Sequence, residues 1–354
     1  MNYDIAIVGL GPAGATLARL LSDHFKVIAI DKKSAGISPS FSKCCGGLLS
    51  DDAQKSLARQ NLALPKEILV NPQIFSVRTI DPNIEEERYY QRFYLNMNRH
   101  AFDMWLISLI PERVKILENS HCSEVRKIPT GGFELIVRSG AELQTISTKI
   151  VIGADGAGSI VRQKLGGTTA TEYVAIQEWY HVPNQQPFYV SLFDQKITDS
   201  YCWALSKDDH LIVGAAVPPD HALERFEQFK DHMIQRGFKL ENKVKREGCK
   251  VLLADSFGDQ DLGREGSYFI GEAAGFISPS SLEGISYAMD SAVVLAKVLN
   301  ESTQEITKRY KKTSFALRMK IHSRIVKRFF IYQPLLRKWI MKSGIQSIKV
   351  EIKP

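Results

Sequence analysis

The sequence lacks any apolar run of the kind that crosses a bilayer. No stretch of about eighteen uncharged apolar residues occurs, which excludes a transmembrane helix of ordinary length. The first residues pass directly into a strand pattern, without the basic and then apolar leader that directs secretion. We therefore expect a cytoplasmic protein that neither spans a membrane nor is secreted.

Cysteine and histidine are spaced too irregularly for a disulfide framework or a metal site. The five cysteines are an odd number, and Cys44 and Cys45 are adjacent rather than separated as metal ligands usually are. The eight histidines have no metal-binding spacing. Neither a Gly-x-Ser-x-Gly elbow nor a Gly-x-x-x-x-Gly-Lys phosphate loop is present. The sequence thus predicts no metal and no serine-hydrolase or P-loop site.

The remaining composition is that of an ordinary globular protein, with 44% hydrophobic and 24% charged residues. The net charge of +7 is unevenly placed, since residues 301–354 contain fourteen Lys or Arg and three Glu, and the rest is slightly acidic. We expect a small-molecule partner and no nucleic acid. Because no heptad seam appears, we also expect a monomer.

The N-terminal segment has the pattern of a β-α-β unit. Residues 3–9 are almost all apolar, as a parallel strand buried on both faces should be. A glycine-rich turn follows, and residues 13–22 are expected to form a helix. Residues 27–31 supply a second apolar strand that ends in a carboxylate.

The turn of this unit has the sequence of a dinucleotide-binding site. It contains Gly9, Gly11, Pro12, Ala13 and Gly14. Glycines here permit a tight turn and let backbone N–H groups and the helix N-terminus reach a pyrophosphate. Asp31, followed by Lys32, can accept hydrogen bonds from ribose hydroxyls. The turn alone does not separate FAD from NAD, and a glycine turn without a ligand is the structural alternative.

The rest of the pattern predicts a mixed α/β protein with a second, antiparallel sheet. Strands are expected at 132–138, 143–148, 150–152 and 268–271, and antiparallel strands within 71–94 and 172–218, where Pro183 and Pro187 mark turns. Helices are expected at 99–109, 283–300, 303–331 and 334–343, and a loop at 31–50. No internal repeat is present.

Two further segments resemble motifs of the aromatic-hydroxylase-like flavoproteins. The Gly-Ala-Asp-Gly segment contains Asp155, which the resemblance places near the pyrophosphate. Residues 98–103 match the family's arginine at the start of a helix, and Arg99 would reach cofactor phosphate or ribityl oxygens. An ordinary surface arginine is the alternative.

The third motif of these flavoproteins is Gly-Asp-Ala-Ala. The matching residues here are Gly271, Glu272, Ala274 and Gly275. The resemblance implies that the acid binds a ribityl hydroxyl and that a helix N-terminus faces the isoalloxazine carbonyls. Glu272 departs from the usual aspartate, and we expect binding to survive the extra methylene. With three motifs in order, the expected cofactor is FAD, held on a Rossmann-type domain.

More specific motifs resemble the geranylgeranyl reductase family of FAD-dependent oxidoreductases. Lys43, Cys45, Gly46 and Gly47 match its Lys-x-Cys-Gly-Gly loop. Tyr201 and Trp203 match its substrate-site Tyr-x-Trp-x-Phe, in which Leu205 replaces the phenylalanine. Gly284 and Ile285 lie in a segment similar to the one that follows the family's Ala-Ala-Gly. Residues 71–77 and 336–341 resemble segments of the CbrA-type branch of this family.

At 354 residues the chain exceeds one average domain, so a cofactor domain and a substrate domain inserted into it are expected. A discontinuous FAD-binding domain is expected to comprise residues 1–70, 96–170 and 255–300. A substrate domain would comprise residues 71–95 and 171–254, and residues 301–354 would form a basic helical region.

The roles of Cys45 and the two aromatic residues remain open at this stage. Cys45 is either a small buried hydrophobe or a thiol that meets the flavin or donates a proton. Tyr201 and Trp203 are two apart on an expected strand, so they face the same side as pocket residues or as core aromatics.

Three functions are compatible with these motifs. The resemblance implies a flavin-dependent reductase of carbon–carbon double bonds with an isoprenoid or lipid-like substrate. An aromatic monooxygenase has the same fold. A non-catalytic flavoprotein with a resistance or membrane-associated role is the third hypothesis.

The basic C-terminal region has an amphipathic helical pattern. Its apolar positions are Ile306, Tyr310, Leu317, Ile321, Ile325 and Phe329. The apolar face can pack on the body of the protein as a cap, and the basic residues can hold the chain reversibly at an anionic inner-membrane surface. The two interpretations are compatible.

Overall fold

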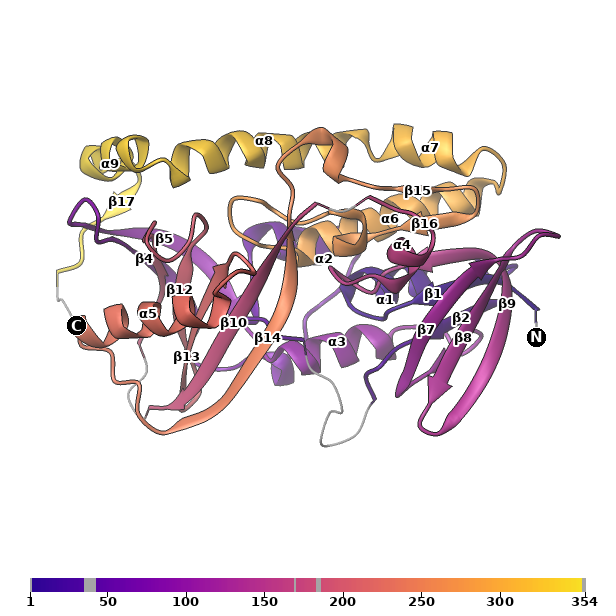
Figure 1. Cartoon of the computed structure of the whole chain (residues 1–354), viewed down its shortest axis with the longest axis horizontal. Helices are drawn as coiled ribbons and strands as arrows, with labels where there is room; N and C mark the ends of the chain where they lie inside the picture. The colour runs from indigo at the N-terminus through magenta and orange to yellow at the C-terminus, as the bar shows by residue number, and fades with distance from the viewer. Residues whose placement is uncertain (1, 35–42, 169, 183–185, 352–354) are drawn as a thin grey trace. The chain divides into compact units, whose positions relative to one another are not determined.

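The computed structural model describes residues 2–34, 43–168, 170–182 and 186–351 (Figure 1). Part of the loop expected at 31–50, and the turn expected at Pro183, lie outside these residues. The described chain divides into two compact units. Unit 1 contains Met1–Ser42, His100–Thr171 and Leu252–Ile325, and unit 2 contains Lys43–Arg99, Glu172–Val251 and Val326–Pro354.

Unit 1 is built on an eight-stranded sheet whose central strands are parallel. Its main path runs β15 (Gly263–Arg264), β16 (Ser267–Phe269), β9 (Glu142–Gly153), β1 (Asn2–Val8), β2 (Val27–Ile30) and β6 (Lys115–Leu117). Strand β1 pairs in parallel with both β2 and β9, so it is surrounded by other strands. Its apolar residues are buried for this reason, as the sequence pattern predicted.

Strand β9 differs from the expectation. The segments expected as separate strands at 143–148 and 150–152 are one twelve-residue strand. Its first part pairs antiparallel with β8 (Phe133–Ser139), which also pairs with β7 (Ser120–Lys127), and its last part pairs in parallel with β1. The burial pattern changes along the strand because its partners change, which made one strand resemble two.

Several helices and short 3₁₀ turns of the described residues accompany this sheet. They are α1 (Pro12–Leu20), α4 (Ile160–Lys164), α6 (Ile285–Glu301), α7 (Ile306–Thr313), α3 (Arg99–Ser108), η2 (Phe257–Asp259) and η3 (Gly271–Ala274). Helix α1 packs along α6. The single helix expected at 303–331 is two helices, α7 and α8 (Phe315–Tyr332), with the buried Ser314 between them.

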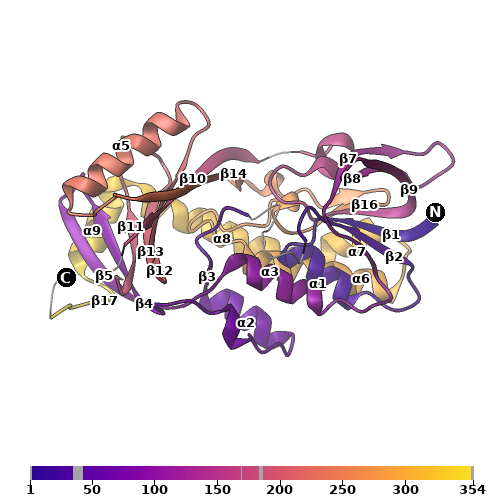
Figure 2. The same ribbon diagram turned by 90° about the horizontal axis from the view of Figure 1, so that it is seen from below.

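Unit 2 contains a nine-stranded sheet (Figure 2). Its order is β14 (Lys243–Leu253), β10 (Thr171–His181), β13 (His210–Val217), β12 (Cys202–Lys207), β11 (Phe188–Leu192), β4 (Ile74–Asp81), β5 (Glu86–Asn96) and β17 (Ser347–Ile348), with β3 (Leu48–Leu49) paired to β5. The expected antiparallel pairing holds between β11 and β12 but not between β11 and β4, which are parallel. These two strands are far apart in sequence, so no hairpin turn fixes their direction.

One face of this sheet packs against α5 (Ala222–Gln235), for which no helix was predicted. Phe226 and Phe229 of α5 join a buried cluster with Cys202 and Ala204 of β12. Because side chains alternate along a strand, the residues between them lie on the opposite face. Unit 2 also contains α2 (Asp51–Arg59), η1 (Lys66–Ile68) and α9 (Pro334–Ser343).

Besides shifts of up to four residues, which include Arg99, the two units differ from the expected domain boundaries in two places. Residues 43–70 belong with the second sheet rather than with the first. The C-terminal helical region is shared, because residues up to Ile325 belong to unit 1 and the remainder to unit 2. None of the described helices has the length and apolar character needed to span a bilayer.

Candidate functional site

The glycine turn after β1 is in close contact with the Gly-Ala-Asp-Gly segment. A Cβ atom on Gly9, whose φ is +95°, would lie 2.6 Å from the carbonyl oxygen of Ala154. A Cβ atom on Gly14 would lie 1.8 Å from the carbonyl oxygen of Gly9 and 3.2 Å from the Cβ of Ala154. The turn and Asp155 are therefore neighbours because both glycines lack side chains.

The third motif reaches the same turn. A Cβ atom on Gly271 would lie 2.9 Å from the Cβ of Ala13, the second residue of α1. The amide of Gly271 donates to Ser291 Oγ of α6 at 2.9 Å. Gly275 has a φ of +77° and also admits no side chain, because its Cβ would lie 2.5 Å from the carbonyl oxygen of Asp259. Three motifs separated by more than a hundred residues thus converge.

Arg162 links two of these motifs, and it was not among the predicted site residues. Its side chain is 1% exposed, and it donates to the carbonyl oxygen of Ala273 at 2.7 Å and to that of Ala157. A buried guanidinium that satisfies carbonyl groups from two loops holds those loops together. Its position after the Gly-Ala-Asp-Gly segment was the available clue.

The residues at this junction fit the pyrophosphate of a dinucleotide. Gly11 differs from its neighbours, because a Cβ atom built on it would meet no described atom within 4 Å. The turn is thus closed on the sides of Gly9 and Gly14 and open at Gly11. Asp155 Oδ2 accepts from the amide of Ile160 at 2.7 Å, and its buried Oδ1 accepts no hydrogen bond from the described residues. Burial raises the pKa of Asp155.

Asp31 is buried at the end of β2 and is already held by backbone donors. Its carboxylate accepts from the amide of Leu10 and, at 2.7 Å, from the amide of Lys33. The Lys33 ammonium lies 3.3 Å from Asp31 and 3.6 Å from Asp103. Lys32, which was predicted to bind the cofactor, has an exposed side chain. Its neighbour Lys33, which was not predicted to be a site residue, is buried in this ion-pair network.

The remaining expected flavin residues occupy helix ends. Glu272 lies in η3 and accepts from the amide of Leu252 at 3.1 Å, and Ala274 is buried beside it. Gly284 is the N-cap of α6 and Ile285 its first residue. Arg99 is the first residue of α3, as expected, and its side chain is half-buried.

In unit 2, the Lys43–Gly47 segment lies against the face of the sheet that points away from α5. A Cβ atom on Gly46 would lie 3.4 Å from Leu205 Cδ2. One on Gly47, whose φ is +67°, would lie 2.4 Å from the carbonyl oxygen of Met97 and 2.7 Å from Lys207 Nζ. Two consecutive glycines thus allow the loop to approach β12 closely.

The two cysteines of this loop have different environments. Cys44 is 8% exposed, and its Sγ lies 3.9 Å from the carbonyl oxygen of Ala175. A hydrogen bond with the neighbouring Cys249 thiol, together with burial, raises the pKa of Cys44 well above its usual range, so Cys44 remains a protonated packing residue. Cys45 is half-buried, and its Sγ accepts from the amide of Gly47 at 3.4 Å.

Tyr201 and Trp203 lie on the same sheet face as the loop and contact each other. Their ring centroids are 5.9 Å apart. The ring of Trp203 lies over Gly214, where a Cβ atom would come within 2.4 Å of it, and Trp203 Nε1 has no hydrogen-bond partner among the described residues. Burial raises the pKa of Tyr201 and of its neighbour Tyr189, so both hydroxyls are protonated donors at neutral pH.

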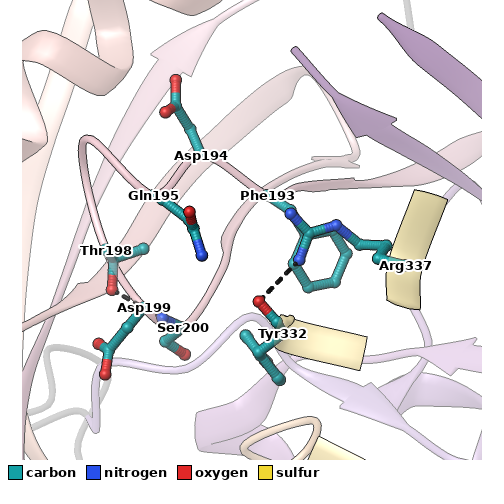
Figure 3. Close-up of a pocket in the computed structure, with 8 residues that line it drawn as sticks. All are labelled: Phe193, Asp194, Gln195, Thr198, Asp199, Ser200, Tyr332 and Arg337. Carbon is teal, nitrogen blue, oxygen red and sulfur yellow. Dashed lines mark hydrogen bonds between the residues drawn. The ribbon is translucent and has the colours of Figure 1, made fainter. Parts of the chain in front are cut away.

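The aromatic cluster extends toward the last helices (Figure 3). The ring of Phe193 lies 6.1 Å from that of Tyr201 and 5.4 Å from that of Tyr332. In Figure 3 the guanidinium of Arg337 lies over the Phe193 ring, at 4.8 Å from its centroid. Phe193, Tyr201 and Tyr332 thus form one aromatic cluster, with the Arg337 guanidinium packed against it.

Lys207 holds the Lys43–Gly47 loop against the sheet by hydrogen bonds. It was not among the residues predicted for the site. It is 5% exposed, and its Nζ donates to Asn96 Oδ1 at 2.8 Å, to the Gly47 carbonyl at 3.3 Å and to the Met97 carbonyl. All three acceptors are uncharged. Burial lowers the pKa of Lys207 to about 8.

We expect this buried lysine to make stability depend on pH. In the unfolded chain its pKa returns to 10.5, so between about pH 8 and 10.5 the unfolded state holds a proton that the folded state has lost. Raising the pH through this window therefore stabilises the fold, by on the order of 1–3 kcal/mol. Urea unfolding of Lys207→Met should lack this increment, and the exposed Lys311→Met should retain it. A constant difference between wild type and Lys207→Met across the window would contradict the assignment.

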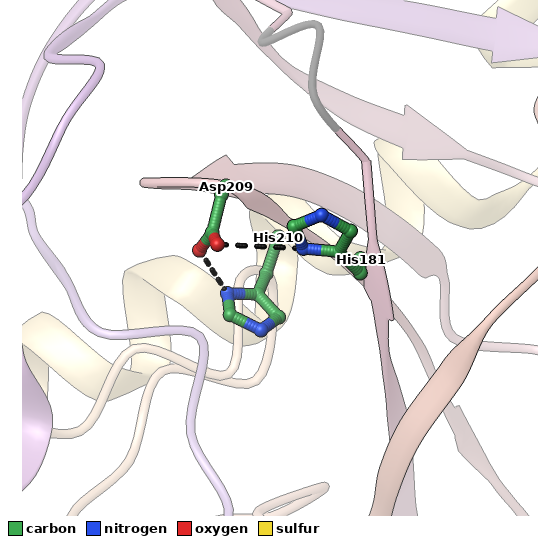
Figure 4. Close-up of side chains that lie close together, drawn as sticks. All are labelled: His181, Asp209 and His210. Carbon is green, nitrogen blue, oxygen red and sulfur yellow. Dashed lines mark ion pairs between the residues drawn. The ribbon is translucent and has the colours of Figure 1, made fainter.

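A separate cluster at the surface of unit 2 has the residue types of a metal site (Figure 4). His181 and His210 are paired across β10 and β13, and the Asp209 carboxylate lies 3.3 Å and 2.7 Å from their Nδ1 atoms. Strand pairing brings His181 to the adjacent residues Asp209 and His210, so spacing along the chain gave no clue. Because Asp209 already pairs with both imidazoles and two of the three side chains are more than half exposed, we assign no metal here. The absence of a metal stays a prediction.

Relatives of known sequence cover almost the whole chain. It is 44% identical over 348 residues to the protein CbrA of Escherichia coli O6:H1, which covers 98% of this chain and 95% of that protein. CbrA of Shigella sonnei is also 44% identical over 348 residues, with 98% of each chain covered. No protein-family model matches the chain.

Solved structures share the fold at low sequence identity. A geranylgeranyl bacteriochlorophyll reductase-like protein from Thermoplasma acidophilum has a TM-score of 0.81 at 20% identity, covering 99% of this chain and 92% of that one. PqsL, a probable FAD-dependent monooxygenase from Pseudomonas aeruginosa, has a TM-score of 0.69 at 14% identity, covering 98% and 100%. The predicted mixed α/β, Rossmann-type flavoprotein fold is confirmed. The chain belongs to the CbrA family, and its fold is that of a geranylgeranyl reductase-like flavoprotein, as its motifs predicted.

Proposed function

We propose that this protein is an FAD-dependent oxidoreductase that reduces carbon–carbon double bonds in an isoprenoid or other lipid-like substrate. One observation carries the cofactor assignment: three glycine motifs converge on a turn that is open at Gly11 and closed at Gly9 and Gly14. The relatives with solved structures include a reductase-like protein and a probable FAD-dependent monooxygenase, which supports flavin chemistry in general.

The residues of unit 1 would hold the cofactor. The amides at Gly11 and at the start of α1 would bind the pyrophosphate, with the N-terminal end of the helix dipole favouring its charge. Asp31 would bind the adenosine ribose, and Glu272 a ribityl hydroxyl. The otherwise unpartnered Asp155 Oδ1 would accept a hydrogen bond from the cofactor or from a water beside it.

The residues of unit 2 would bind the substrate and donate the proton that completes reduction of the double bond. Bound FAD supplies a hydride in its reduced form. Tyr201 and Trp203 would pack against the apolar chain and exclude water. We assign to the Cys45 thiol the donation of a proton to the second carbon of the double bond, after which the thiolate regains a proton from solvent. Lys207 is a positioning residue, because it holds the loop that carries Cys45.

Anaerobic turnover tests this proposal. The purified yellow protein would be reduced chemically, and polyprenyl compounds would then be added without oxygen. We expect flavin absorbance to return together with a product that has gained two hydrogens per double bond, detected by mass spectrometry. A saturated analogue of the same chain length is the control and should leave the flavin reduced.

Two other outcomes would replace the proposal. Oxygen consumption coupled to hydroxylation of an aromatic substrate would identify a monooxygenase, the class to which PqsL is described as probably belonging. Reduced flavin that persists with every polyprenyl compound, and no coupled oxygen use, would indicate a non-catalytic flavoprotein.

A further inference from the structure

The apolar residues of the amphipathic C-terminal region divide into a buried set and an exposed set. Leu317 and Ile321 are 8% and 0% exposed and belong to the core of unit 1. Phe329 continues the same sequence pattern but is 60% exposed. The expectation of a packed cap therefore holds for the first part of α8, whereas Val326, Phe329 and Phe330 in its last turns face solvent.

These last turns and α9 expose a group of large apolar side chains. We define the C-terminal apolar patch as Val326, Phe329, Phe330, Leu335, Trp339 and Ile340, which are 40% to 78% exposed. Single exposed apolar residues are common on protein surfaces, but a run of them on consecutive helices indicates a surface that binds something.

The exposure of this patch follows from the way α9 is anchored. Arg337 is 4% exposed and its Nε lies 2.5 Å from Asp81 Oδ2, while Met341, one turn later, is 1% exposed. Figure 3 shows Arg337 pointing into the unit beside Phe193. Residues two positions from Arg337 lie on the far side of a helix with 3.6 residues per turn. Leu335 and Trp339 therefore point away from the body.

The chain segment that carries the patch is basic, although two of its arginines pair with acidic residues of other elements, Arg337 with Asp81 and Arg328 with Asp199. Residues 324–349 include seven Lys or Arg and no Asp or Glu. On α9, Lys338 lies between Leu335 and Trp339, and Lys342 follows Ile340. A second copy of the chain would bring the same positive charge to the contact and be repelled, whereas an anionic lipid surface complements both the charge and the apolar side chains.

We propose that the C-terminal apolar patch docks this protein reversibly on an anionic lipid bilayer. Trp339 and Leu335 enter the headgroup region, and the lysines of α9 pair with lipid phosphates. Docking goes beyond the proposed reaction and does not depend on it. It would bring the protein to the bilayer in which a lipid-like substrate resides.

Vesicle binding tests the proposal without any measurement of activity. The full-length protein would be sedimented with vesicles of phosphatidylcholine alone or mixed with phosphatidylglycerol. We expect binding to the mixed vesicles, weakened by salt, and little binding to the neutral ones. Tryptophan emission should shift to shorter wavelength on binding, because Trp339 is 78% exposed and the other three tryptophans are buried or half-buried. Trp339→Phe should bind but lose the shift.

Matched variants separate the patch from general surface effects. We expect Leu335→Ser with Trp339→Ser to reduce the vesicle partition coefficient about ten-fold or more. Leu143→Ser changes a leucine that is 62% exposed in unit 1 and should have no effect. Lys338→Glu with Lys342→Glu should weaken binding more than the same charge reversal at Lys311 and Lys312 of α7.

Three results would overturn the proposal. One is equal binding of wild type and the patch variants, and another is equal binding to neutral and anionic vesicles. The third is a lipid-free dimer, seen by sedimentation velocity and abolished by Leu335→Ser, which would assign the patch to self-association. The failure of polyprenyl turnover with intact vesicle binding would overturn only the proposed reaction.

Discussion

A Gly11→Val variant is expected to fold normally and to purify without bound flavin. Gly11 has a φ of −69°, which valine adopts readily, and its Cβ would meet no described atom within 4 Å. The protein itself therefore tolerates the side chain. The valine would, however, stand where the pyrophosphate is proposed to approach the turn. We expect flavin occupancy to fall at least ten-fold, or about 1.4 kcal/mol.

The measurement is the ratio of flavin to protein absorbance, with thermal unfolding as the check on the fold. Gly248→Val is the matched control, because Gly248 is exposed on β14 and its Cβ would make only an ordinary contact of 3.6 Å with Ala175. It should keep full occupancy. A Gly11→Val protein that purifies fully yellow would show that the pyrophosphate lies elsewhere.

A Cys45→Ser variant is expected to keep its flavin and lose turnover by about 100-fold or more, the usual contribution of a positioned acid. Serine is close in size and can accept the same hydrogen bond from the Gly47 amide, so the loop should be retained. Its hydroxyl is a far weaker acid than a thiol, so it would not supply the proton at neutral pH.

Cys44→Ser provides a control one residue away. Cys44 is buried, and its thiol lies near the Ala175 carbonyl, to which a serine hydroxyl can also donate. We expect turnover within a few-fold of wild type in this variant. Both proteins would be compared in the anaerobic assay and by flavin content. Normal turnover of Cys45→Ser would return that residue to a packing role.

Local chemistry made much of unit 1 predictable. The glycine turn, the apolar strands and the carboxylate of Asp31 are contiguous in sequence, so their pattern predicted the β-α-β unit directly. Strands whose length or pairing direction depends on partners distant in the sequence were harder to predict. Strand β9 was divided in two because it changes partners along its length, and β11 pairs in parallel with a strand more than a hundred residues away.

The selected site residues were those that glycine spacing or family motifs identify. Arg162, Lys33 and Lys207 were missed, because a charged side chain in a sequence does not show whether it is buried. Each became recognisable only when the fold placed it against carbonyl groups or carboxylates of remote segments.

The sequence by itself determined the family, the fold class and the residues that could bind a dinucleotide, because these depend on backbone freedom and short-range spacing. Only the tertiary structure decided which glycine leaves the turn open, which cysteine is buried and which part of the C-terminal pattern faces solvent. Those properties depend on what packs against each residue. The same helical periodicity buries Ile321 and exposes Phe329, because the first has a core beside it and the second does not.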